Sequence, residues 1–485
     1  MIGRKGDAAG ITPTPTSIGQ EGDAGGITPT PTFPSAGRPA LRLGLLLGML
    51  YGPVTFGMIA AAVAVPYAAV DSAPFALVWL LSGYAIALGV GTAMFGPLTE
   101  RWGTRACLRV GTALMLAGAA VCLASVQAPM VLLGRVVLAL GSSAVVTVVL
   151  TIASQVGVRD RTAVSASLGA VMATCLSVAT LAGGFATEVF GWRVALVLPL
   201  LSVAGVPFLA RRHHRAGQTT APIDVAGAVL LLVFVAGTVG LTQVMLLGPV
   251  PTAALVAAVV VSGTALWVRA RRRVDAFVPA PLVRDRQFRR ACLLAACVYG
   301  ARFAVVVGAG IVLAGDGWSP VSSGVALVPC AVAGVWLGRA SRRLPPARVV
   351  LLAMAALAVA AIVVPNVAGS VASLLVATVI SSTAFAVGQP MLTMSLATLR
   401  TERRGTAVGL TYCVAFAGGA AGTAAVGALS SVLGASHALG VVAATALVGA
   451  SVAVARRVGT DQVIRPQAHR ALVMPQASPH KEAVR

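Results

Sequence analysis

The segment from Gly96 to Arg105 reads GPLTERWGTR. It places three charges and two glycines between two apolar runs, residues 76–98 and 107–126. A helix rises about 1.5 Å per residue, so either run is long enough to cross a hydrocarbon core of about 30 Å. The segment is therefore predicted to be a short surface loop between two membrane-spanning helices, with Gly96 and Gly103 permitting a tight turn.

The composition of the chain agrees with a membrane environment. Of its 485 residues, 58% are hydrophobic and 10% are charged, whereas soluble domains carry about 25% charged residues. A net charge of +22 can indicate nucleic-acid binding, but the arginines stand in short clusters between apolar runs, as in cytoplasmic membrane loops. We expect no nucleic-acid partner, no metal and no cofactor, because the five histidines and seven cysteines show no metal-ligand spacing.

Fourteen apolar runs follow one another from Leu43 onward. They cover residues 43–65, 76–98, 107–126, 129–152, 163–187, 193–210, 224–247, 250–269, 289–313, 320–338, 347–367, 370–395, 407–432 and 436–455. Arginine clusters occupy every second break between the runs, and the other breaks hold almost none. This positive-inside asymmetry predicts a multi-pass protein of the plasma (inner) membrane with an even number of helices and both termini cytoplasmic.

The two ends of the chain differ from its apolar centre. Residues 1–41 are rich in Pro, Gly and Thr, and the segment GDAAGITPTPT at 6–16 recurs as GDAGGITPTPT at 22–32. Such a repeat cannot bury a core, so residues 1–41 and 458–485 are predicted to be disordered cytoplasmic tails. No short apolar segment with a small-residue cleavage site precedes the first long run, so no secretory signal is predicted.

The GPLTERWGTR segment resembles the loop signature of the major facilitator superfamily, Gly-x-Leu-(Ala)-Asp-Arg-x-Gly-Arg-(Lys/Arg), at the same loop. The matching residues are Gly96, Leu98, Arg101, Gly103 and Arg105, with Glu100 in the place of the acid. The resemblance implies a cytoplasmic latch, whose charges contact neighbouring helix ends in the outward-facing state and release them in the inward-facing state. The residues themselves suggest that Glu100 interacts with the amino end of the third helix, where the helix dipole favours an acid.

Further segments resemble the same family. Residues 133–141, with Arg135 and Gly141, resemble its Arg-bearing fourth-helix motif, and Trp192-Arg193 resembles the pair that opens the sixth helix. PAPLVRDRQFRR, at 279–290, resembles a segment before the ninth helix of the fourteen-span drug:proton antiporters, and residues 324–343 resemble their tenth helix.

The resemblance implies an all-α integral membrane protein of about fourteen helices in a six, two and six arrangement. Residues 42–212 would form an N-terminal six-helix bundle, 213–288 two extra helices with a cytoplasmic linker, and 289–457 a C-terminal six-helix bundle. Two pseudo-twofold halves around a central site are the architecture that supports alternating access. In the fifth helix, Gly183-Gly184 is expected at a close helix contact, although the Gly-Pro that precedes this pair in antiporters is absent.

Two arginines lie inside apolar runs, where a charge costs about 2.5 to 3.5 kcal/mol and usually marks function. Arg135 either snorkels to one membrane face or, as the resemblance implies, belongs to the cavity and to proton coupling. Arg302 lies midway along the ninth run, with Tyr299 one turn earlier. It either binds an anionic or hydrogen-bonding group of a substrate or pairs with an internal carbonyl.

Three more polar side chains are candidates for lining a cavity, against the alternative that they only pack or bond between helices. They are Tyr51, Gln389 and Tyr412, in the first, twelfth and thirteenth runs. By resemblance, the first and twelfth runs correspond to cavity-lining helices of the family.

The predicted function is secondary active transport rather than enzymatic catalysis. We expect a monomer in the lipid bilayer that exports small amphipathic compounds by alternating access, with protons as the coupling ion. The alternatives are an importer or uniporter of a small metabolite and, more remotely, a non-transporting scaffold. Every Asp and Glu lies in a loop, a tail or at a helix end, which argues against export of cations. The chain has no HExxH or GxSxG motif of a hydrolase and no GxxxxGK[ST] motif for binding ATP.

Overall fold

The computed structural model describes residues 38–67, 74–156, 158–212, 224–244, 247–273, 276–340, 371–397, 404–434 and 437–442, and the regular structure in these ranges is helical. The elements are α1 (Arg38–Tyr51), η1 (Gly52–Thr55), α2 (Phe56–Ala64), η2 (Val65–Tyr67), α3 (Pro74–Ala124), α4 (Ala128–Gln155), α5 (Val158–Phe190), α6 (Trp192–Val197), η3 (Leu198–Gly205), α7 (Val206–Arg212), α8 (Val225–Leu241), α9 (Pro249–Arg272), α10 (Ala280–Arg284), α11 (Arg286–Gly315), α12 (Pro320–Ala340), α14 (Val371–Ala397) and α15 (Arg404–Leu433).

The described helices include nine that are long and apolar enough to cross a membrane, and two shorter apolar ones at 225–241 and 374–386. They coincide with predicted runs. The run at 347–367 and most of the run at 436–455 lie outside the described residues, as do residues 1–37 of the first predicted tail and the whole of the second, 458–485. The count of fourteen therefore stays a prediction.

The second and third runs form a helical hairpin within α3. Gly103 has φ 81° and ψ 164°, a conformation that interrupts the helix and that glycine adopts without strain. Gly91 and Gly111 lie against neighbouring residues of α4, Ser143 and Ala144, so the chain reverses direction between them. The predicted turn is thus at Gly103.

Gly96, the other glycine expected in the turn, is helical instead. A Cβ at this position would lie 3.2 Å from the carbonyl oxygen of Gly405 in α15. Its smallness therefore serves a close approach between two helices rather than a reversal of the chain.

Proline interrupts the first and sixth runs. Pro53 cannot donate a backbone hydrogen bond, and the chain there narrows into the short 3₁₀ helix η1 between α1 and α2. Pro199 has the same position at the start of η3, between α6 and α7.

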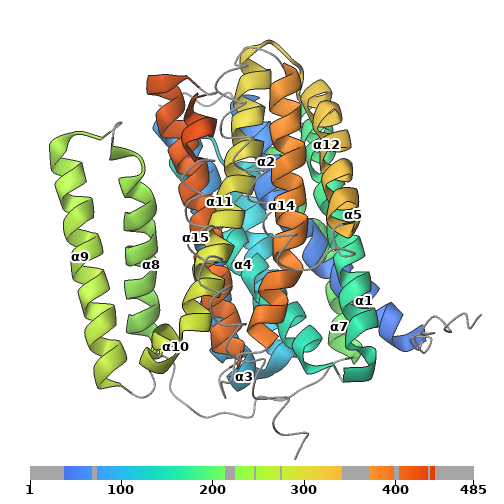
Figure 1. Cartoon of the computed structure of the whole chain (residues 1–485), viewed down its shortest axis with the longest axis vertical. Coiled ribbons are helices and arrows are strands. Elements are labelled where there is room, and N and C mark those ends of the chain that lie inside the picture. The colour runs from blue at the N-terminus through green and yellow to red at the C-terminus, as the bar shows by residue number, and fades with distance from the viewer. Residues whose placement is uncertain are drawn as a thin grey trace, which may run out of the picture. The chain divides into compact units, whose positions relative to one another are not determined.

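The helices outside α8–α10 form two groups that pack against each other (Figure 1). In the N-terminal helix group, α1 to α7, α3 packs on α4 and α5 packs on α1, α2 and α6. In the C-terminal helix group, α11 to α15, α11 packs on α14 and α15, and α12 packs on α14. Contacts between the groups run from α3 to α15, from α5 to α12 and from α2 to α11.

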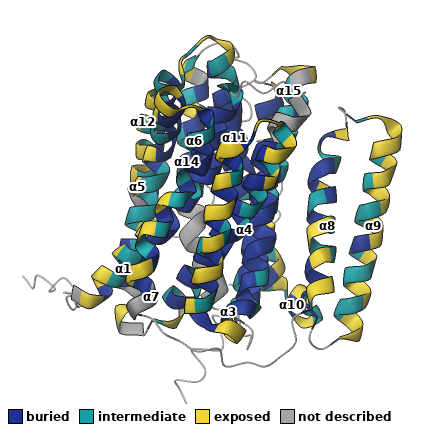
Figure 2. Ribbon diagram, turned by 180° about the vertical axis from the view of Figure 1, so that it is seen from behind, coloured by how far each residue is buried: buried dark blue, intermediate teal, exposed yellow. Residues whose placement is uncertain are grey.

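α8 and α9 pack on each other. Among the helix pairs with substantial contact, α8 alone joins this pair to the two groups, by packing on α3 and α15. Figure 1 shows them side by side next to the other helices, and Figure 2 shows α9 exposed over most of its length. Ser262 is its buried residue. A surface of exposed valines on an apolar helix is the pattern expected for contact with lipid.

Candidate functional site

Arg135 in α4 is fully buried and holds three helices by their backbone. Its Nε donates to the carbonyl of Leu80 at 2.7 Å and its Nη2 to that of Gly57, also at 2.7 Å. Its Nη1 donates to the carbonyl of Leu196 at 3.3 Å. The guanidinium lies over the ring of Tyr84, 4.6 Å from the centroid. Arg135 thus binds α2, α3 and α6 to α4 and does not snorkel to a membrane face.

This arrangement uses the geometry of the guanidinium. Its rigid fork presents donors in several directions, and it stays protonated in proteins. Carbonyl dipoles and an aromatic face can stabilise such a buried cation without a carboxylate. The contacts support a role for Arg135 in positioning helices, and its role in coupling stays a prediction.

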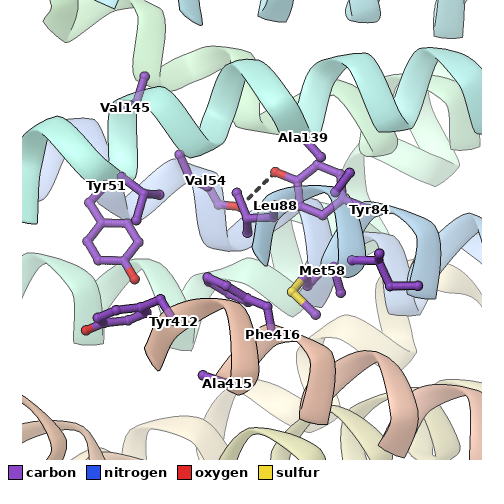
Figure 3. Packing of buried hydrophobic residues seen from close by; sticks show 14 of the residues in the cluster. Tyr51, Val54, Met58, Tyr84, Leu88, Ala139, Val145, Tyr412, Ala415 and Phe416 are labelled. Atoms are coloured by element: carbon purple, nitrogen blue, oxygen red, sulfur yellow. Dashed lines mark hydrogen bonds between the residues drawn. The ribbon is translucent and has the colours of Figure 1, made fainter. Parts of the chain in front are cut away.

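A cluster of tyrosines and phenylalanines lies where the two helix groups meet. Tyr51 of α1 is hydrogen-bonded to Tyr299 of α11 and lies close to Tyr412 of α15. All three are buried, with exposed fractions of 3% to 4%. Figure 3 shows the hydroxyl of Tyr51 directed toward the ring of Tyr412, with Phe416 beside them.

Tyr299 is the centre of this aromatic cluster. Its ring centroid lies 5.1 Å from that of Phe385 in α14, 5.3 Å from that of Phe416 and 5.9 Å from that of Phe303. The interplanar angles of 58° to 84° are tilted or edge-on, which is the favoured geometry for aromatic pairs. The structure therefore brings together three tyrosines that were predicted from widely separated runs.

Arg302 lies one helical turn beyond Tyr299 and is only 3% exposed. Its Nη1 is buried and has no hydrogen-bond partner. Cys330 of α12 is the titratable side chain that interacts with it electrostatically. The predicted alternative, a hydrogen bond to an internal carbonyl, does not occur at this nitrogen.

The GPLTERWGTR segment lies against the start of α15. Leu98 is buried, whereas Glu100, Arg101 and Arg105 are exposed. A Cβ on Gly405, in the first turn of α15, would lie 2.7 Å from Glu100 Oε1. The carboxylate of Glu100 is therefore next to the amino end of a helix from the other group. The resemblance implied a contact with a neighbouring helix end but did not say which helix.

Tyr67 and Glu188 make further contacts between the two helix groups. The Tyr67 hydroxyl donates to the carbonyl of Trp318 at 2.6 Å, and Glu188 Oε2 accepts from the backbone N–H of Val321 at 3.0 Å. Gly184 packs on the backbone of Pro320. Gly183 packs on the backbone of Ala60, so the Gly183-Gly184 pair lies at two close helix contacts.

The remaining predicted residues have structural surroundings. Gly141 packs directly on the second half of α3, since a Cβ there would lie 2.6 Å from the backbone nitrogen of Met115. Trp192 is buried at the start of α6, and Arg193 lies over its ring while its Nε donates to the carbonyl of Ser125 at 3.1 Å. Gln389 lies on α14, but its side chain is outside the described residues.

Outside the spans, Asp224 organises the start of α8. Its carboxylate caps the helix by accepting from Gly227 N at 3.0 Å and also accepts from Phe277 N at 3.2 Å. It forms an ion pair with Arg269 at the end of α9. Desolvation alone would raise the pKa of Asp224, but the hydrogen bonds from Arg269 and from the two backbone groups outweigh it and lower that pKa.

The model of the Major Facilitator Superfamily matches residues 45–423 of this sequence. The chain belongs to this superfamily. The described apolar helices agree with a multi-pass membrane protein of this superfamily. Among the described residues, no group of three or more His, Cys, Asp or Glu is placed to hold a metal ion.

Curated relatives in the superfamily include two uncharacterised MFS-type transporters of Mycobacterium tuberculosis, MT1926 and Rv1877. Each is 26% identical over 300 residues, covering 57% of this chain and 43% of the relative. The matched part thus spans less than half the length of these relatives.

Solved structures of several transporters share the fold. A POT family transporter in complex with 5-aminolevulinic acid is 13% identical, with a TM-score of 0.63, 87% of this chain and 97% of the other being covered. The human organic anion transporter MFSD10 (TETRAN) is 15% identical, with a TM-score of 0.56 and coverage of 86% and 98%.

Several residues of the site were not predicted from the sequence. Phe303, Phe385 and Phe416 surround Tyr299, and Tyr84 lies under Arg135. Two of them could have been predicted from their spacing. Phe303 and Phe416 follow Tyr299 and Tyr412 by four residues and so share a helix face with them.

Proposed function

We propose that this transporter exports small amphipathic compounds by alternating access, with protons as the coupling ion. The observation that carries the proposal is the aromatic cluster between the helix groups. A substrate site of an alternating-access transporter lies between two halves that rock against each other. The cluster draws Tyr51 from one group and Tyr299, Phe385 and Tyr412 from the other, and aromatic surfaces with hydroxyl groups suit an amphipathic ligand.

The GPLTERWGTR segment is proposed as a latch between the groups. The support is the position of Glu100 at the amino end of α15, where the helix dipole favours a negative charge by about 0.3 to 1 kcal/mol. Such an energy is enough to bias two conformations that differ by a few kcal/mol. Arg101 and Arg105 are exposed on the same segment and would set its orientation at the cytoplasmic face.

The remaining parts of the proposal concern topology. We place both termini in the cytoplasm, the protein in the plasma membrane as a monomer, and the N- and C-terminal bundles at 42–212 and 289–457. The apolar pair α8 and α9, between the two helix groups in the chain, supports a place in the fourteen-span drug:proton antiporter branch.

The direct test measures flux in membrane vesicles of both orientations, with and without an imposed pH gradient. Export by proton exchange predicts substrate accumulation in inverted vesicles that collapses when the gradient is dissipated. Accumulation in right-side-out vesicles would show import.

One observation favours a second candidate, uniport or import without a proton. Every acid of the chain lies outside the centres of the apolar runs, and embedded carboxylates are the common proton carriers of transporters. Flux that is unchanged by the pH gradient would establish this candidate in place of the antiporter.

A further inference from the structure

Arg302 occupies an unusual position for a cation. It lies at the middle of the 30-residue helix α11 and is almost completely buried. A guanidinium remains protonated in proteins and carries five N–H donors. A charge at this depth is costly unless it is paired and hydrogen-bonded, yet its buried Nη1 has no partner.

The chain does not supply a counter-charge for it in the described region. The acids of the described helices are at helix ends, and the ion pair among these residues joins Asp224 and Arg269, outside the aromatic cluster. The titratable neighbour of Arg302 is the thiol of Cys330, a weak hydrogen-bonding group. An oxyanion from outside the chain would therefore satisfy a group that the protein leaves open.

The surroundings define the rest of such a ligand. Tyr299 precedes Arg302 by one turn, so their Cβ atoms are about 5 to 6 Å apart on one helix face. Around Tyr299 lie Phe385 and Phe416 at centroid distances of 5.1 and 5.3 Å. A cation beside an aromatic wall fits a molecule with a flat apolar body and one anionic end.

We propose that Arg302 binds the carboxylate of the transported substrate, and that the substrates are small amphipathic organic anions. The planar fork of an arginine matches a carboxylate in a bidentate manner, which a lysine cannot reproduce. Bound substrate supplies the counter-charge that the described residues do not provide at this site. This inference rests on the proposed transport function and specifies its substrate class.

The test uses purified protein reconstituted in liposomes and three matched sets of probes with the same naphthyl bodies. The sets carry a carboxylate, a neutral carboxamide or an ammonium group, and both binding and flux are measured. The intact protein is expected to bind and move the carboxylates about 10- to 100-fold better than the other two sets.

Three variants separate the charge from the geometry and from folding. Arg302→Met is expected to lose the carboxylate preference altogether, and Arg302→Lys to retain only part of it, because an ammonium keeps the charge but not the fork. Arg271→Met removes an exposed arginine that lies over Trp267 at the end of α9. This control should keep the full preference.

The possible failures are distinct. If no probe of any set is moved, the proposed transport function fails. If probes are moved without preference for carboxylates, or if Arg302→Met moves carboxylates as well as the intact protein does, the inference about Arg302 is overturned while transport stands. Should Arg302→Met not fold, the preference of the intact protein and its reduction in Arg302→Lys still decide the question.

Discussion

Two buried arginines sit in the two helix groups, and their surroundings are opposite. Arg135 donates to three carbonyls from three helices and lies over an aromatic ring. Arg302 is almost as deeply buried, but its Nη1 has no partner. The same side chain therefore has its donors used by the fold in one group and at least one donor, Nη1, left open in the other.

If Arg302 binds substrate as proposed, the difference separates a structural charge from a functional one. A cation that is satisfied by backbone groups fixes the positions of the helices that carry them. A cation without a partner destabilises the fold by itself and is stabilised only when a ligand arrives. Burial of a charge alone thus does not indicate a binding site, whereas burial together with an open donor does.

The strongest test of this comparison is to remove the charge at Arg135. Arg135→Met loses three interhelical hydrogen bonds, each worth about 0.6 to 1.7 kcal/mol in membrane proteins, and a cation–π contact. We expect the free energy of unfolding, measured by denaturation in mixed micelles, to fall by about 3 kcal/mol. An unchanged stability would show that the three carbonyl contacts do not hold the helices together.

The close contact between α5 and α12, which joins the two helix groups, can be tested by enlarging Gly184. Gly184→Val would overlap the backbone of Pro320 and push α12 away from α5, at a cost of about 1 to 3 kcal/mol in states where these helices touch. We expect less disulfide cross-linking between cysteines introduced at Glu188 and Val321 in this variant.

The matched control for this change is on the same helix. Gly169 of α5 faces open space, with no atom within 4 Å of the point where a Cβ would lie, so Gly169→Val should leave the cross-linking yield as it is. Equal yields in both glycine variants would show that the close approach of α5 and α12 does not depend on the small size of Gly184.

The substitution Arg302→Met makes the same change at the other buried arginine. Arg302→Met breaks no hydrogen bond at Nη1 and removes a buried charge, a change that is often neutral or stabilising. We expect the free energy of unfolding without substrate to stay the same or rise by about 1 kcal/mol. A loss as large as that of Arg135→Met would mean that Arg302 has structural partners after all.

Asp224 is a charged residue outside the spans that has hydrogen-bond and ion-pair partners, and its contribution to stability should depend on pH. The lowered pKa of Asp224 means that its contribution to stability is complete above the ordinary Asp pKa, about 3.9, and is lost as the pH falls through the lower pKa of the folded state. Asp224→Asn should therefore be less stable than the intact protein at neutral pH, by about 1 kcal/mol. The difference between the two melting curves should shrink as the pH falls below about 4, and a pH-independent difference would contradict the assignment.

The sequence was informative where a property depends on the local chain. The apolar runs and the charged segment between them predicted the helices of α3 and the reversal at Gly103, and the four-residue neighbourhood placed Tyr299 beside Arg302. It was not informative about the partners of Arg135, because the carbonyls of Gly57, Leu80 and Leu196 belong to the backbone and carry no residue identity. The position of Glu100 next to α15 likewise depends on helix packing between distant parts of the chain.

The smallest expected effect concerns the ring beneath Arg135. The Tyr84 hydroxyl lies 3.3 Å from the carbonyl oxygen of Val54 and 3.3 Å from Ser142 Oγ. It has one proton to donate to these two acceptors, and both contacts are long and weak. Tyr84→Phe keeps the aromatic face under the guanidinium, so we expect a loss of only about 0.5 kcal/mol in the free energy of unfolding. Tyr84→Leu removes the face as well and should cost about 1 to 2 kcal/mol more. If the two variants are equally stable, the ring does not stabilise the buried cation, and the carbonyls alone account for the satisfied state of Arg135.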